Sequence, residues 1–81
     1  MKIRIPGYSS LTGSPAAIVD SMKTARFFGV AEDEDYIKTV VADIKRLYDV
    51  ELHVEGSTLP EQAESLLREL AKNEFIVIEE E

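Results

Sequence analysis

Residues 50–78 read VELHVEGSTLPEQAESLLRELAKNEFIVI and change their hydrophobic period twice. Apolar and polar residues alternate over 50–55, which is the period of a strand that is buried on one face. After a Gly-Ser break, Thr58 and Glu61 have the spacing of a capping box, and the helix that they open has one apolar face. Residues 75–78 close the stretch as a short apolar run. The stretch therefore predicts a strand, a helix and a second strand, which is a layered α/β unit.

The residues before this stretch predict one further strand and two further helices. Residues 2–5 alternate between basic and apolar side chains, as a half-buried strand does. Ser14 followed by proline is a typical helix start, so a helix is expected over residues 15–27. A second helix is expected over 36–48, after the acidic run 32–35, which favours a helix N-terminus. Its apolar stripe consists of Tyr36, Ile37, Val40, Val41, Ile44, Leu47 and Tyr48.

The expected order of elements is therefore β-α-α-β-α-β. Three strands and three helices of these lengths predict an α/β fold of the α+β type, a two-layer sandwich. Its helices are expected on one face of a three-stranded mixed sheet. The second and third strands, joined through a helix, are expected to run parallel, with the third and most apolar strand at the centre. Eighty-one residues with 44% hydrophobic content make a single domain, residues 1–81.

The charge of the chain is divided unevenly. The net charge is −7 and the pI is about 4.6. Four bases against one acid give residues 1–28 a charge of +3, and five bases against fifteen acids give residues 29–81 a charge of −10. This balance argues against nucleic acid as a partner, because such binding depends on Lys and Arg that neutralise phosphates. The acidic part leaves open one alternative, a decoy that occupies a nucleic-acid-binding site on another protein.

The composition also indicates where the protein works. The chain has no cysteine, which excludes disulfides and thiolate metal sites and agrees with a reducing compartment. Residues 1–6 lack the apolar core of a signal peptide, and no stretch approaches the length of a membrane span. We therefore expect a cytoplasmic protein that has no membrane partner.

His53 is the only histidine, and it lies between Glu51 and Glu55 on the polar face of a predicted strand. One interpretation makes it a general base or a metal ligand. A metal site normally needs three or more ligands, however, and the chain has no second histidine and no cysteine. We therefore interpret His53 as an ordinary exposed residue, and we expect no catalytic residue, no metal and no cofactor.

Residues 7–14, GYSSLTGS, follow a predicted strand and open a predicted helix. Backbone N–H groups and hydroxyls at a helix N-terminus can hold an anion. The spacing matches neither a Walker A loop nor the three-glycine dinucleotide pattern, and a simple helix-capping loop explains the same residues. The candidate anion-binding residues are Ser9, Ser10, Thr12, Gly13 and Ser14.

Arg26, Phe27 and Phe28 form a candidate contact surface for a partner. Adjacent helical positions project about 100° apart, so burying both phenylalanines in one small core is difficult. Aromatic residues and arginine are enriched at interface hot spots. The alternative is that both phenylalanines cover the core from the end of the helix.

These features predict a small cytoplasmic protein-interaction or regulatory module without catalytic activity. Its partner is another protein, and a homodimer is the alternative form of association. The hypothesis from a different class is a binder of a small anion or nucleotide through residues 7–14, as a subunit of an enzyme.

Overall fold

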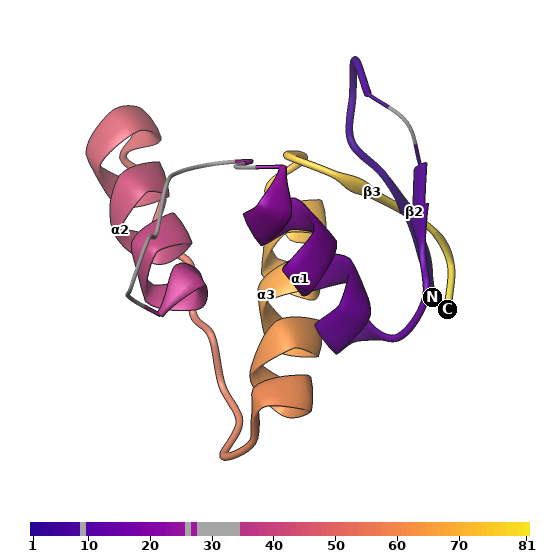
Figure 1. Ribbon diagram of the computed structural model, residues 1–81. Helices are drawn as coiled ribbons and strands as arrows, with labels where there is room; N and C mark the ends of the chain where they lie inside the picture. The colour runs from indigo at the N-terminus through magenta and orange to yellow at the C-terminus, as the bar shows by residue number, and fades with distance from the viewer. Residues whose placement is uncertain (9, 26, 28–34) are drawn as a thin grey trace.

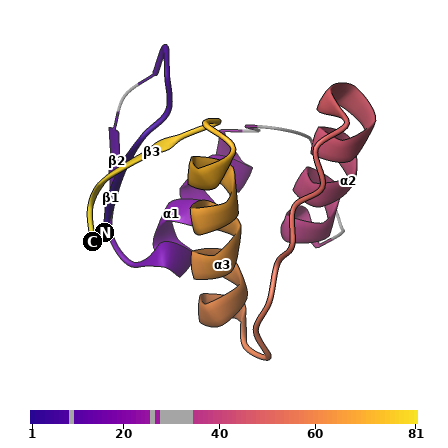
Figure 2. The ribbon, with the colours of Figure 1, turned by 180° about the vertical axis from the view of Figure 1, so that it is seen from behind.

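The computed structural model describes residues 1–8, 10–25, 27 and 35–81. Its elements are β1 (Lys2–Arg4), β2 (Ser10–Thr12), α1 (Pro15–Thr24), α2 (Tyr36–Tyr48), α3 (Leu59–Lys72) and β3 (Val77–Glu80). Figures 1 and 2 show that all three helices lie on the same side of the sheet. The α1–α3 pair lies next to the strands, and α2 lies on the far side of that pair. The fold is of the α+β type with its helices on one face, as the sequence predicts.

The sheet differs from the predicted one in its topology. Its order is β2-β1-β3, and both strand pairs are antiparallel. The predicted parallel pair and the predicted central third strand are therefore wrong, because β1 is central and β3 is an edge strand. Ile3 lies opposite Leu11 of β2 and Ile78 of β3. Ile3 is fully buried and these two neighbours pack against the core, so one face of the sheet meets the helices.

Residues 10–12 form a strand where the sequence analysis expects a loop. Gly7 has a φ of 86°, which favours glycine, and the N–H of Tyr8 donates to the Ile5 carbonyl at 2.8 Å. This turn brings the chain back alongside β1. Leu11 is the only apolar residue of β2, so the stretch carries too little hydrophobic pattern to predict a strand.

The predicted strand over residues 50–55 is also wrong, although its burial pattern is confirmed. Leu52 is only 4% exposed. Val50 and Val54 are half-buried, and Glu51, His53 and Glu55 are exposed. The segment runs as an extended chain along α3 and α2 (Figure 2), but no strand among the described residues pairs with it. The alternation of apolar and polar residues over 50–55 therefore indicates which side chains are buried. It does not indicate the hydrogen-bond partners of the backbone.

Side chains of α3 take the place of a neighbouring strand. The N–H of His53 donates to the Glu69 carboxylate at 2.9 Å. The N–H of Glu55 donates to the Ser65 hydroxyl at 2.9 Å, and that hydroxyl lies 3.5 Å from the His53 carbonyl, to which it donates. Ser65 and Glu69 are four residues apart, so both face the segment from one side of the helix. This arrangement fixes the 50–55 segment without a sheet.

α3 supplies the centre of the hydrophobic core. Ala63, Leu66, Leu67 and Leu70 are fully buried on its inner faces. The helix contacts α1, α2 and β3. The other large side chains that are almost completely buried are Ile3, Ile18, Met22, Val40, Ile44 and Ile76. The Thr58 hydroxyl accepts the N–H of Glu61 at 3.3 Å, which confirms the predicted helix start.

Removing the Glu69 carboxylate tests how the 50–55 segment is held. We expect Glu69→Ala to lower the free energy of unfolding by about 0.5–1.5 kcal/mol, because the His53 N–H loses its acceptor. Urea unfolding followed by circular dichroism measures this difference. Glu64→Ala is the matched control, since Glu64 is exposed on the same helix and its ion pair with Arg68 is long, at 3.7 Å. Equal losses for the two variants would contradict the assignment.

Candidate functional site

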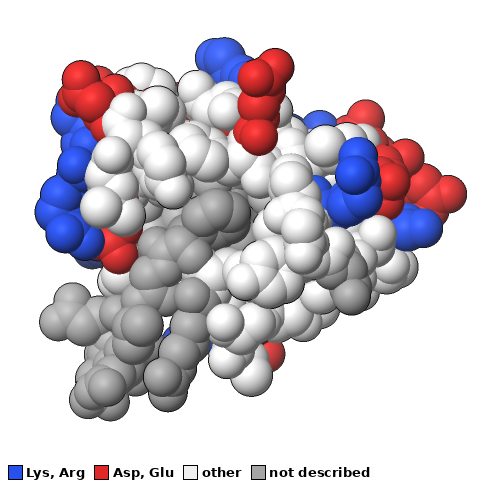
Figure 3. All heavy atoms as spheres, turned by 90° about the horizontal axis from the view of Figure 1, so that it is seen from above, with Lys and Arg blue, Asp and Glu red and all other residues white. Residues whose placement is uncertain are grey.

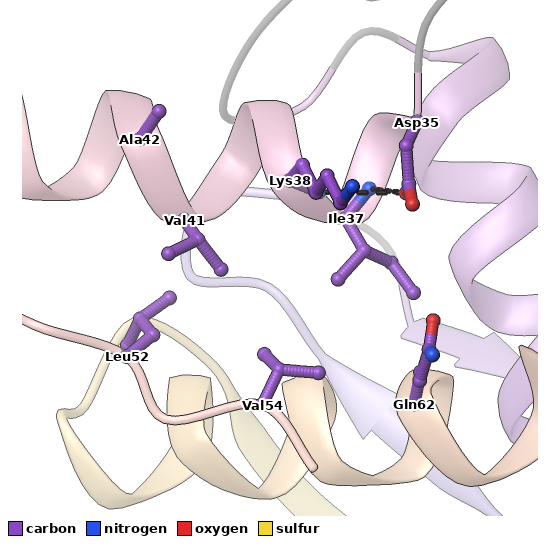
Figure 4. Close-up of a pocket in the computed structure, with 8 residues that line it drawn as sticks. All are labelled: Asp35, Ile37, Lys38, Val41, Ala42, Leu52, Val54 and Gln62. Atoms are coloured by element: carbon purple, nitrogen blue, oxygen red, sulfur yellow. Dashed lines mark hydrogen bonds between the residues drawn. The ribbon is translucent and has the colours of Figure 1, made fainter. Parts of the chain in front are cut away.

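A groove of about 510 Å³ lies between α2 and the 50–55 segment, and we call it the α2 groove. Figure 4 shows Val41 of α2 pointing toward Leu52 and Val54, which point toward it from the opposite wall. Gln62 of α3 points into the same space near the N-terminus of α2. Apolar side chains therefore form most of the groove, and the polar ones lie toward one end.

Two residues with positive φ set the path of the groove's outer wall. Asp49, with a φ of 55°, ends α2 in the left-handed conformation and reverses the chain, and its N–H donates to the Lys45 carbonyl at 3.0 Å. Gly56 has a φ of 125°, and a Cβ there would lie 2.6 Å from the Cβ of Glu61. Only glycine fits at Gly56, because any side chain there would be strained and would clash. The 50–55 segment is therefore fixed at both ends.

The polar groups at the end of the groove are partly used by the fold. Asp35 caps α2, and its carboxylate accepts the N–H groups of Ile37 at 3.0 Å and Lys38 at 3.4 Å. The carboxylate of Asp35 thus already occupies the place at the N-terminus of α2 where a bound anion would lie. A second hollow of about 270 Å³ between α1, α2 and α3 adjoins the groove and shares Asp35 and Ile37 with it.

A separate polar groove of about 490 Å³ runs past His53 along the outer side of α3. Its lining residues are His53, Glu55, Glu61, Glu64, Ser65, Arg68, Glu69 and Lys72, all of them exposed or half-buried. Among the described residues, no three His, Cys, Asp or Glu side chains stand close enough together to hold a metal ion. The groove therefore presents charges of both signs to water.

The described candidate anion-binding residues are divided between β2, which holds Ser10 and Thr12, and the start of α1, which Gly13 and Ser14 precede. Ser10 lies on β2, and its hydroxyl donates to the Glu79 carboxylate at 3.1 Å, which places a negative charge beside it. Thr12 is exposed on the same strand. Ser9 lies outside the described residues.

The start of α1 likewise has few donors left for an anion. The Ser14 hydroxyl accepts the Ala17 N–H at 3.2 Å, so it acts as the predicted helix cap. The N–H of Gly13 donates to the Met1 carbonyl at 3.0 Å. Pro15, the first residue of the helix, has no N–H. Anion binding by this loop stays a prediction, and the contacts of the described residues favour a capping role.

The candidate partner surface is described only at Phe27, because Arg26 and Phe28 lie outside the described residues. α1 ends at Thr24, so Phe27 follows the helix in place of belonging to it, contrary to the expected end at 27. Phe27 is half-buried against the core, and the Tyr8 ring meets it edge-on at a centroid distance of 4.6 Å. Its carbonyl accepts the Tyr36 hydroxyl. Phe27 thus helps to cover the core. A partner surface formed with Arg26 and Phe28 stays a prediction.

The last turn of α2 carries exposed apolar residues that the sequence analysis places on a buried stripe. Leu47 is 62% exposed and Tyr48 is 58% exposed. The Tyr48 ring lies 5.2 Å from the Phe75 ring, beside the turn into β3. The helical period predicts Leu47 and Tyr48 on the inner face of α2. The last turn of α2 lies beyond the end of α3, however, so α3 does not cover these two residues (Figures 1 and 2). Sequence reasoning missed this surface because a period does not show where the neighbouring helix ends.

Charges of both signs are mixed on the molecular face shown in Figure 3. Basic and acidic side chains of the described residues lie next to one another at its margins, and no broad basic area forms among them. Within the sheet, Arg4 and Glu79 form an ion pair at 3.5 Å.

Comparison with known protein families, with curated proteins and with solved structures finds no match to this chain. Within the described residues, every helix is too short or too polar to cross a membrane. The function must therefore be argued from the geometry of the chain itself.

Burial of Tyr36 generates a testable pH dependence. Tyr36 is 4% exposed, and its burial raises the pKa of the phenol well above the ordinary value of 10.0. The folded state then keeps a proton that the unfolded state releases above about pH 10, so stability falls as the pH rises through that range. In the double variant Tyr8→Phe, Tyr48→Phe, Tyr36 is the only tyrosine, and ultraviolet absorbance reports its ionisation. A midpoint at or below pH 10 in the folded protein would contradict this prediction.

Proposed function

We propose that this chain is a small cytoplasmic protein-interaction module, regulatory in role and without catalytic activity, and that the α2 groove receives its partner. The observation that supports this proposal is an apolar groove whose outer wall is fixed by the chain and which the described residues leave uncovered. Val41 and Val54 are half-buried on its two sides. Both keep apolar surface in contact with water, and a partner would remove that surface from water.

The exposed residues next to the groove favour a protein over a small molecule. Val41 and Tyr48 are seven residues apart on α2, so they lie on the same side of the helix two turns apart. Exposed apolar side chains therefore recur at Leu47 and Tyr48, about two turns from Val41, with the exposed Lys45 between them. Tyrosine is enriched at interface hot spots, and it buries a large surface at a small entropic cost. An elongated surface of this kind suits a polypeptide better than a compact ligand.

The polar groups near the groove do not converge on one point, and this arrangement favours binding over catalysis. Small-molecule and catalytic sites normally combine an apolar pocket with polar groups that converge on one point. Here the Asp35 carboxylate is already bonded to the N-terminus of α2. Lys38 is exposed at the rim, and His53 belongs to the other groove.

Recovery of the partner from the native cells, with a matched pair of variants, tests the proposal. Val41→Glu places a charge in the groove, and Val77→Glu makes the same change at a residue that is 41% exposed on β3, on the opposite side of the molecule. We expect the tagged chain and Val77→Glu to recover the same protein, and Val41→Glu to recover at least about tenfold less because burying an unpaired charge is costly. Circular dichroism confirms that each variant is folded.

The same preparations distinguish a foreign partner from a second copy. Light scattering gives the mass of the purified chain, and a dimer that Val41→Glu dissociates would make the partner another copy of this protein. Equal recovery by Val41→Glu and the unchanged chain, or repeated recovery of nothing by a chain that is also monomeric, would refute the proposal.

A further inference from the structure

We infer that the occupant of the α2 groove is an extended peptide segment that adds as a strand to the free edge of the 50–55 segment and alternates apolar with basic residues. This inference rests on the proposed interaction function, and it specifies the chemistry of the partner.

The backbone of the 50–55 segment has one bonded edge and one free edge. In an extended chain, the N–H and carbonyl groups of successive residues point to opposite sides. The N–H and carbonyl of His53 and the N–H of Glu55 point toward α3, where Glu69 and Ser65 bond these three groups. The backbone groups of Leu52 and Val54 therefore point away from α3.

The residues that carry these groups, Leu52 and Val54, line the α2 groove. Within the described part of the chain, the N–H and carbonyl groups of Leu52 and Val54 form no hydrogen bond. Leu52 is only 4% exposed as a whole residue, whereas Val54 is half-buried, so Val54 is the more accessible part of this edge. Buried backbone groups without partners are costly, and nearly all of them are paired in folded proteins. A strand laid along this edge would supply the missing donors and acceptors, which is the principle of β-augmentation.

The two faces of the segment define the side chains of the added strand. Leu52 and Val54 face the groove with Val41, so alternate residues of the peptide would meet an apolar surface there. Glu51 and Glu55 are exposed on the other face, on either side of His53. Side chains directly opposite one another on paired strands interact, and unlike charges stabilise while like charges destabilise. The remaining residues of the peptide are therefore expected to be Lys or Arg.

The same charges argue against a second copy of the 50–55 segment as the added strand. Pairing two copies would set Glu51 and Glu55 of one against the carboxylates of the other. The edge of β3 is also acidic, through Glu79 and Glu80. The charge of −10 over residues 29–81 further favours a basic partner.

A synthetic peptide of defined sequence tests this inference on the full chain. The probe is acetyl-KVKVKVK-amide, and the comparison peptides are acetyl-EVEVEVE-amide and the Lys-Val peptide with every backbone amide N-methylated. Amide hydrogen exchange followed by NMR reports the backbone groups directly. We expect the Lys-Val peptide to slow exchange at Leu52 and Val54 by about tenfold or more, because both amides gain acceptors. Both comparison peptides should bind about tenfold more weakly or not at all.

Two variants of Val54 separate the effect of its N–H from the effect of its side chain. Val54→Pro deletes an N–H that has no hydrogen-bond partner among the described residues, and Val54→Ala shortens the side chain while keeping that N–H. Val54→Pro is expected to bind the Lys-Val peptide about threefold to tenfold more weakly than Val54→Ala. If Val54→Pro does not fold, the exchange rates in the unchanged chain decide the question alone.

Two results would overturn the inference. One is binding of the Lys-Val peptide that leaves the exchange of Leu52 and Val54 unchanged, which would place the ligand elsewhere or bind it in another conformation. The other is no binding of the Lys-Val peptide at millimolar concentration. Either result would refute only the inferred strand addition. The proposed interaction function is tested separately, because the expected loss of the natural partner in Val41→Glu does not depend on the conformation of that partner.

Discussion

α3 is the element on which both the core and the groove depend. One side of the helix buries Leu66, Leu67 and Leu70 against α1, α2 and the sheet. Another side presents Ser65 and Glu69, which bond the backbone of the 50–55 segment. A small domain gains little net stability from its core alone, so few bonds of this kind are dispensable. The helix thus replaces a strand as the neighbour of an extended segment.

Because a helix and not a strand lies beside residues 50–55, one edge of this extended segment is left without hydrogen-bond partners among the described residues. Had residues 50–55 joined the sheet as a central strand, both of their edges would have been paired. Because α3 bonds only one edge, Leu52 and Val54 leave their backbone groups at the α2 groove. Asp49 and Gly56 hold the two ends of the segment, so the free edge is built into the fold. This is the physical basis on which we propose that the groove binds a polypeptide.

The spacing of apolar residues along the sequence predicted most of the buried side chains correctly. It did not predict which groups the backbone of residues 50–55 forms hydrogen bonds with. The alternation of 50–55 identified Leu52 as buried and His53 as exposed, and Thr58 was correctly identified as the start of α3. The acceptors of the segment could not be predicted, because Glu69 lies sixteen residues from His53 and no pattern links the two. Leu11 sits among small polar residues, which hid the strand β2. The α2 groove was out of reach because it depends on the reversal at Asp49, where the sequence has no glycine to mark it.

Amide hydrogen exchange of the free protein, resolved along residues 50–55, tests most directly whether α3 bonds one edge of this segment and leaves the other open. The structure requires alternating protection, with His53 and Glu55 exchanging more slowly than Leu52 and Val54. Protection of all four amides to the level of β1 would show a paired strand. That result, or protection of Leu52 and Val54 alone, would contradict the arrangement from which the groove and its proposed partner are argued.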